Sequence, residues 1–143
     1  MRALLFAVAA SVAAVALPVH AENVTVEVTA IVEHPALDAV RDGVKDALAA
    51  AGYKEGENLT FVYKSAQGNA ATAAQIARQF AGEGPTVIVP ISTPSAQAVA
   101  AATRDIPIVF SAVSDPVGAQ LVKGMDKPGG NITGLSGMSP VAE

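Results

Sequence analysis

At three places where a helix should begin after a strand, a polar residue directly precedes a proline: His34-Pro35, Thr93-Pro94 and Asp115-Pro116. Proline is favoured at a helix start because its missing N–H would have no partner there. Threonine and aspartate are good N-caps, and histidine is a poorer one. Each pair therefore predicts a helix start, and the free backbone N–H groups of such a start attract an anion such as a carboxylate.

The start at Thr93-Pro94-Ser95 is the best candidate for binding a carboxylate, because it offers two hydroxyls and no competing negative charge. Simple helix capping is the alternative role for Thr93. Glu33 and Asp115 bring negative charge to neighbouring loops, where either could hold an ammonium group. Taken singly, each is a solvated carboxylate or a cap. On one rim with an anion-binding helix start, they predict a site for a zwitterion such as an amino acid.

The residue types argue against catalysis. The chain has no cysteine, and His34 is its only histidine after residue 21, so neither thiolate chemistry nor the usual zinc site can be built. No G-x-S-x-G elbow precedes a helix, and no G-x-G-x-x-G or P-loop motif is present where a nucleotide fold would carry it. We expect no enzyme activity, no metal and no cofactor, and interpret His34 as a loop or ligand-stacking residue.

Along the chain, segments with the residue pattern of β-strands alternate with segments whose apolar residues recur at the spacing of a helix. Strands are predicted over residues 24–32, 59–63, 86–91, 106–113 and 132–135. Helices are predicted over residues 35–51, 69–81 and 94–102, with a short one over 117–123.

Strands separated by single helices predict an α/β fold, a doubly wound parallel sheet with helices on both faces. Ligands of such sheets bind beyond the carboxyl ends of the strands. The loops expected there are the most polar at the strand exits, and they cover residues 33–35, 65–69, 92–95 and 114–116.

The first 21 residues predict a signal peptide that is cleaved after Ala21. Arg2 precedes an apolar run over residues 3–17, which is shorter than the roughly 20 residues that span a membrane. Without Arg2, eight basic and 13 acidic residues remain, a net charge of −5, and no basic run suggests nucleic-acid binding. A signal without a cysteine for lipid attachment predicts a periplasmic protein with no lipid anchor.

Five segments at these strand exits, in this order and spacing, resemble a family of ABC-transporter substrate-binding proteins that includes the tryptophan- and aromatic-amino-acid-binding type. The segments are Val-Glu-His-Pro-Ala-Leu-Asp (32–38), Ala-Gln-Gly-Asn (66–69), Ser-Thr-Pro-Ser-Ala-Gln-Ala (92–98), Ile-Pro-Ile-Val-Phe-Ser-Ala-Val-Ser-Asp-Pro (106–116) and Lys-Pro-Gly-Gly-Asn-Ile-Thr-Gly (127–134).

The resemblance implies a two-lobed type I periplasmic-binding fold, whose flavodoxin-like lobes close on a small ligand and deliver it to an ABC permease. Residues 22–143 would form the N-terminal lobe, and the second lobe would be absent, since family members are about twice as long. The resemblance adds Gln67 and Ser92 to the expected ligand-binding residues, which are then Glu33, His34, Gln67, Ser92, Thr93, Ser95 and Asp115.

Two alternatives remain open from the sequence. One is a stand-alone flavodoxin-like domain with an enzymatic or regulatory role, against which the signal peptide and the missing nucleotide motifs argue. The other is a truncated fragment without function. Few aromatic residues and no tryptophan follow the signal, so no aromatic box indicates the ligand's side chain.

Overall fold

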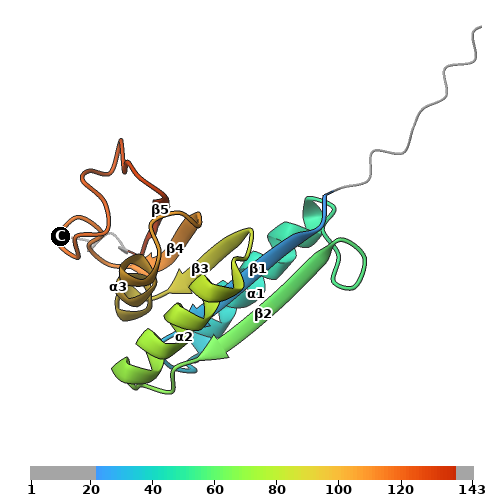
Figure 1. Ribbon diagram of the computed structural model, residues 1–143, viewed down its shortest axis with the longest axis horizontal. Helices are drawn as coiled ribbons and strands as arrows, with labels where there is room; N and C mark the ends of the chain where they lie inside the picture. The colour runs from blue at the N-terminus through green and yellow to red at the C-terminus, as the bar shows by residue number, and fades with distance from the viewer. Residues whose placement is uncertain (1–21, 138–143) are drawn as a thin grey trace, which may run out of the picture.

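The computed structural model describes residues 22–137, which form a five-stranded sheet with three helices (Figure 1). The predicted signal peptide lies outside the described residues. The elements in chain order are β1 (Val24–Ala30), α1 (Pro35–Ala50), β2 (Leu59–Ser65), α2 (Ala70–Glu83), β3 (Val87–Ile91), α3 (Thr93–Ala102), β4 (Ile108–Val113) and β5 (Ile132–Ser136).

All pairings in the sheet are parallel, and the strand order is β2-β1-β3-β4-β5. The predicted α/β class and parallel sheet are confirmed. β1 pairs along its length with β2, from Val24 opposite Leu59 to Ala30 opposite Ser65, and Ala30 also lies opposite Ile91 of β3. Because parallel strands with this register end level, their carboxyl ends meet at one edge of the sheet.

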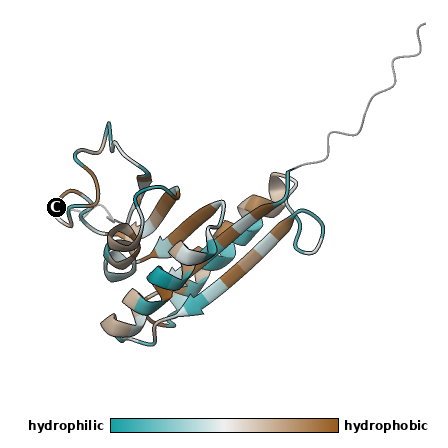
Figure 2. Cartoon of the chain, viewed as in Figure 1, coloured by the Kyte–Doolittle hydropathy of each residue, from teal (hydrophilic) through white to brown (hydrophobic). Residues whose placement is uncertain are grey.

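The helices divide between the two faces of the sheet (Figure 1). α2 and α3 cover one face, where Phe80, Ile88 and Phe110 lie in the larger apolar core. α1 covers the other face, where its apolar side packs on Val28, Val89 and their neighbours in a second core. Apolar residues concentrate along the strands, as Figure 2 shows. This is the pattern expected of a parallel sheet that is buried on both faces.

Within the described residues, no helix is both long enough and apolar enough to cross a membrane. The predicted elements are present, with ends that shift by one or two residues, except for the helix predicted over residues 117–123. That prediction is wrong, because this segment forms a series of turns. The Asp115 carboxylate accepts a hydrogen bond from the Gly118 N–H at 2.8 Å, and Gln120 has a φ of 60°, so the backbone closes on itself instead of continuing as a helix.

A carboxyl group is buried on the face of the sheet that α2 covers. Glu27 of β1 is 2 % exposed, and its Oε2 atom has no hydrogen-bond partner among the described residues. Burial, and then its interaction with Glu83, raise the pKa of Glu27 to about 8, although nearby Lys64 opposes the shift. The same contact lowers the pKa of Glu83. Glu27 is therefore neutral in the folded protein at neutral pH, since an ionised carboxylate would be costly in this environment.

The raised pKa of Glu27 makes stability depend on pH. Between about pH 4.5 and 8, the unfolded carboxyl ionises while the folded one keeps its proton. The free energy of unfolding should therefore fall as pH rises through this window and level off above it. Glu27→Gln should remove this slope and stabilise the protein at pH 8 by roughly 4 kcal/mol, with little effect at pH 4.5.

Chemical denaturation from pH 4.5 to 9 measures both effects, and Glu57→Gln on an exposed loop is the matched control. An unchanged pH slope in Glu27→Gln would show that Glu27 does not carry the effect.

Candidate ligand-binding site

The three helices begin at the carboxyl edge of the sheet, and the residues predicted to bind a ligand lie at or beside these starts, except for Asp115, which lies in the turn that follows β4. α1 begins after Glu33 and His34, α2 begins just after Gln67, and α3 begins at Thr93. We call this edge the strand-exit rim and define it by residues 31–36, 65–70, 92–96 and 114–116. A backbone hydrogen bond links two of these loops, since the Gly68 N–H donates to the Ile31 carbonyl oxygen at 2.6 Å.

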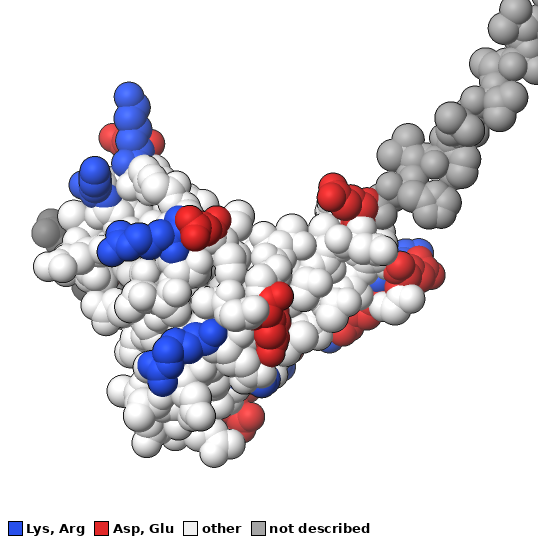
Figure 3. Space-filling model, in the orientation of Figure 1, with Lys and Arg blue, Asp and Glu red and all other residues white. Residues whose placement is uncertain are grey.

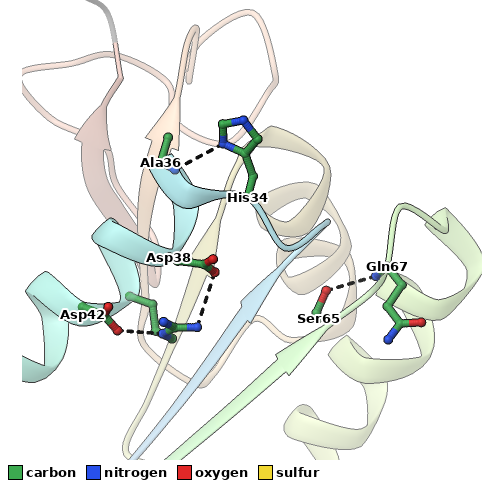
Figure 4. A network of polar contacts seen from close by, with 7 residues as sticks. His34, Ala36, Asp38, Asp42, Ser65 and Gln67 are labelled. Carbon is green, nitrogen blue, oxygen red and sulfur yellow. Dashed lines mark hydrogen bonds and ion pairs between the residues drawn. The ribbon is translucent and has the colours of Figure 1, made fainter.

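His34 caps α1 with its side chain. Its Nδ1 accepts a hydrogen bond from the Ala36 N–H at 3.2 Å, and Pro35 is the first helical residue (Figure 4). Nδ1 must therefore carry no proton, so the ring presents its Nε2–H outward. The sequence predicted a helix start here but ranked histidine as a weak cap. The exposed imidazole performs the capping, and its other nitrogen remains at the rim.

An ion-pair cluster fixes the first turns of α1. The Arg41 guanidinium contacts Asp38 at 3.3 Å and Asp42 at 2.8 Å (Figure 4). It also lies 4.9 Å from the centre of the Tyr63 ring. The hydrogen bond from Arg41 lowers the pKa of Asp42. Burial raises the pKa of Tyr63 most, and the negative charge of Asp38 raises it further. The sequence analysis did not single out Arg41 or Tyr63, because a cation stacked across elements leaves no local pattern.

Gln67 and Asn69 shape the second loop of the rim. Gln67 is exposed with a φ of 52°, and its N–H donates to the Ser65 Oγ at 3.2 Å (Figure 4). Asn69 caps α2, because its Oδ1 accepts from the Thr72 N–H at 3.0 Å. Asn69 was not among the predicted site residues. An asparagine directly before an alanine-rich helix is the signal that could have revealed this cap.

The third loop of the rim differs from the prediction by one residue. Ser92, not Thr93, is the N-cap of α3, so that Thr93 and Pro94 are its first two residues. Ser92 has a φ of 87° and makes no side-chain capping bond, and its N–H donates to Ser111 at 2.9 Å. The helix starts early because β3 runs into it without a linking turn. The first backbone N–H groups of α3 therefore lie directly beside the end of β3.

Ser95 lies in the first turn of α3 and is 1 % exposed. Neither its Oγ nor that of Ser92 has a hydrogen-bond partner among the described residues. A buried hydroxyl without a partner is costly. The α3 start therefore combines free backbone N–H groups with two hydroxyls that have unused hydrogen-bonding capacity.

Asp115 does not begin a helix, contrary to the expectation from Asp115-Pro116. Its Oδ1 atom accepts a hydrogen bond from the Gly118 N–H at 2.8 Å, and a side chain on residue 118 would overlap the other carboxylate oxygen, Oδ2. The residue is exposed at the rim. The Asp115 side chain thus closes a turn instead of capping a helix, and its second oxygen is the part that could meet a cation.

Other features offer less for ligand binding. A groove of about 590 Å³ lies near the amino end of β5, between Arg104 and Asn131. Asn131 is used to hold the fold there, donating to the Ile106 carbonyl at 2.7 Å. Among residues 22–137, no group of three or more His, Asp or Glu side chains could hold a metal ion. On the face shown in Figure 3, basic and acidic side chains are interspersed, and large areas carry neither.

Comparison with known proteins identifies the relatives of this chain. The family model described as ABC transporter substrate binding protein matches residues 25–143. A crystal structure of a conserved domain protein from Vibrio cholerae is 62 % identical with a TM-score of 0.82, over 84 % of this chain and 40 % of that one. The tyrosine-binding protein of Clostridioides difficile is 47 % identical over 76 % of this chain.

A third relative is a Streptococcus pneumoniae ABC domain in complex with L-Trp. It is 39 % identical with a TM-score of 0.77, over 80 % of this chain and 39 % of that one. This chain spans 32 % of the tyrosine-binding protein and about two fifths of the solved relatives. Two of these relatives are described by the amino acid that they bind, tyrosine in one and L-Trp in the other. The family match over nearly the whole described region shows that the chain belongs to the ABC transporter substrate-binding protein family.

Proposed function

We propose that this chain forms the N-terminal lobe of a binding protein that captures an amino acid at the strand-exit rim and delivers it to an ABC permease. Two relatives support this ligand class, since one is named for tyrosine binding and another holds L-Trp. A second lobe, within the length that this chain does not span, would supply the opposite wall. The signal over residues 1–21, cleaved after Ala21, would place the protein in the periplasm.

The start of α3 carries the proposal. The hydroxyl of buried Ser95 and the free N–H groups of the first turn are suited to a ligand carboxylate, which would supply the missing acceptor. Ser92 and Gln67 both have positive φ at this rim. Backbone strain of this kind costs about 1–3 kcal/mol and concentrates at binding sites. Thr93, half-buried, would be the third hydroxyl beside the carboxylate.

The acidic side of the rim is suited to the ligand's ammonium group. Glu33 is exposed, and so is Asp115, of which one oxygen is held by Gly118. The His34 ring, fixed by its capping bond, would present its outer nitrogen and its face to the ligand. The groups that bind the ligand's carboxylate, those that bind its ammonium and the His34 ring would thus come from different loops. Recognition would therefore depend on the sheet that positions these loops.

Ser95→Ala separates binding from stability. Removing a buried hydroxyl that lacks a partner should leave the free protein equally or more stable, while affinity for L-tyrosine or L-tryptophan falls by about tenfold, the loss of one hydrogen bond to a charged group. Thermal shift and calorimetry on residues 22–143 measure both quantities, with a sugar as the negative ligand.

Thr29→Val is the matched control, because Thr29 is another buried hydroxyl without a partner, 2 % exposed, within β1. It should raise stability without changing affinity. Absence of any amino-acid binding at millimolar ligand, or equal affinity in wild type and Ser95→Ala, would contradict the assignment.

His34 can be tested for a role beyond capping. His34→Ala should lower the free energy of unfolding by about 1 kcal/mol, because it leaves the Ala36 N–H without its acceptor. His34→Asn restores a good cap and should restore stability. If the ring contacts the ligand, affinity stays reduced in both variants. Full recovery of affinity in His34→Asn would show that the ring acts only as a cap.

A further inference from the structure

The groove near the amino end of β5 lies at the edge of the sheet opposite the strand-exit rim. Its walls are Arg104, which follows α3, the start of β5, and part of the long connection between β4 and β5 (Figure 1). Its volume of about 590 Å³ is within the range of small-molecule sites. A ligand in this groove would therefore be separate from one at the rim.

Two cationic side chains and no carboxylate line the groove. Arg104 and Lys123 are both exposed, and neither forms an ion pair with another described residue. The acidic residues near them in the sequence, Asp105 and Asp126, do not line the groove. Over the whole chain, acidic residues outnumber basic ones by 13 to 9. A groove whose charged side chains are all basic is therefore a local exception to the overall charge, and it attracts anions.

The backbone adds hydrogen-bond donors to the same groove. Gly129 and Gly130 both line it with a φ of 70°, a conformation that glycine adopts without strain. Both residues are exposed, and neither N–H group donates a hydrogen bond to a described residue. Successive backbone N–H groups in turns form concave sites that bind anions. Two amides and two cations are therefore available to a single oxyanion.

Apolar side chains form much of the remaining wall. Val117 lines the groove and is 44 % exposed, and the other apolar residues there are the more buried Leu121, Val122 and Ile132. An organic group attached to a bound anion would find an apolar contact beside the cations. The groove offers no carboxylate to an ammonium group, so it is unsuited to the zwitterion proposed for the rim.

We propose that this groove, which we call the basic groove, binds a phosphate monoester, either as a free small molecule or as the headgroup of phosphatidic acid. A phosphate monoester carries nearly two negative charges at neutral pH, so it can use both Arg104 and Lys123. Arginine binds phosphate through two parallel N–H donors. The organic part of the ester would lie against Val117. A carboxylate carries only one charge and would be held less tightly.

Phenyl phosphate is the probe for this site, because it joins a phosphate monoester to an apolar ring. NMR titration of residues 22–143 at low ionic strength should show saturable shifts at the amides of Gly129 and Gly130. Benzoate, which has the same ring and one charge, should bind more weakly by about fivefold. Equal affinity for benzoate, or shifts that leave both glycines unaffected, would overturn the proposal.

The double variant Arg104→Gln with Lys123→Gln should weaken phenyl phosphate binding by about tenfold, because each exposed charge contributes a few-fold. Lys54→Gln with Arg78→Gln is the matched control, since it removes the same two charges at exposed positions that do not line the groove. Substitutions at exposed positions should leave the fold intact, which the other amide shifts report. Unchanged affinity in the first variant, or an equal loss in the control, would contradict the assignment.

Sedimentation with vesicles distinguishes the two sources of phosphate. If the ligand is a lipid headgroup, the chain should sediment with phosphatidylcholine vesicles that contain phosphatidic acid but not with phosphatidylcholine alone, and the double variant should lose this binding. Phenyl phosphate binding without sedimentation would identify a free phosphate ester. Failure to bind both phenyl phosphate and the vesicles would overturn the proposal.

Discussion

The parallel register of β1 between β2 and β3 is the constraint on which the rest of the structure depends. It brings the ends of three strands level, so that Ala30, Ser65 and Ile91 lie side by side. Each of these strands is followed by a helix, and the amino ends of the three helices are therefore delivered to the same rim. A shift of register by one residue would also reverse the faces of β1 and remove Val26 and Val28 from their core.

The rim combines satisfied and unsatisfied polar groups. Caps from His34 and Asn69 satisfy local donors, while Ser95 keeps a buried hydroxyl without a partner among the described residues. A ligand that hydrogen-bonds this hydroxyl would remove the cost of leaving it unpaired.

Much of this architecture could be predicted from the sequence. The spacing of apolar residues predicted the strands and the three long helices. The pairs of a polar residue and a proline identified two of the three helix starts at the rim. The failures have local causes. Asp115-Pro116 has the residues of a helix start, but the Asp115 side chain closes onto Gly118 and the segment turns back. Ser92 became the cap in place of Thr93 because β3 and α3 join directly.

Other features could not be predicted because they depend on partners distant in the chain. The contact between Arg41 and Tyr63 and the burial of Glu27 each require the packed sheet.

Ligand capture at the strand-exit rim is the central claim, and backbone amide chemical shifts of residues 22–143, followed by NMR during titration with L-tyrosine, test it most directly. The account predicts saturable shifts concentrated at the amides of the rim, strongest in the first turn of α3 from Thr93 to Ala96. Shifts confined to the opposite edge of the sheet, around Arg104 and Asn131, or no saturable shifts at all, would contradict it.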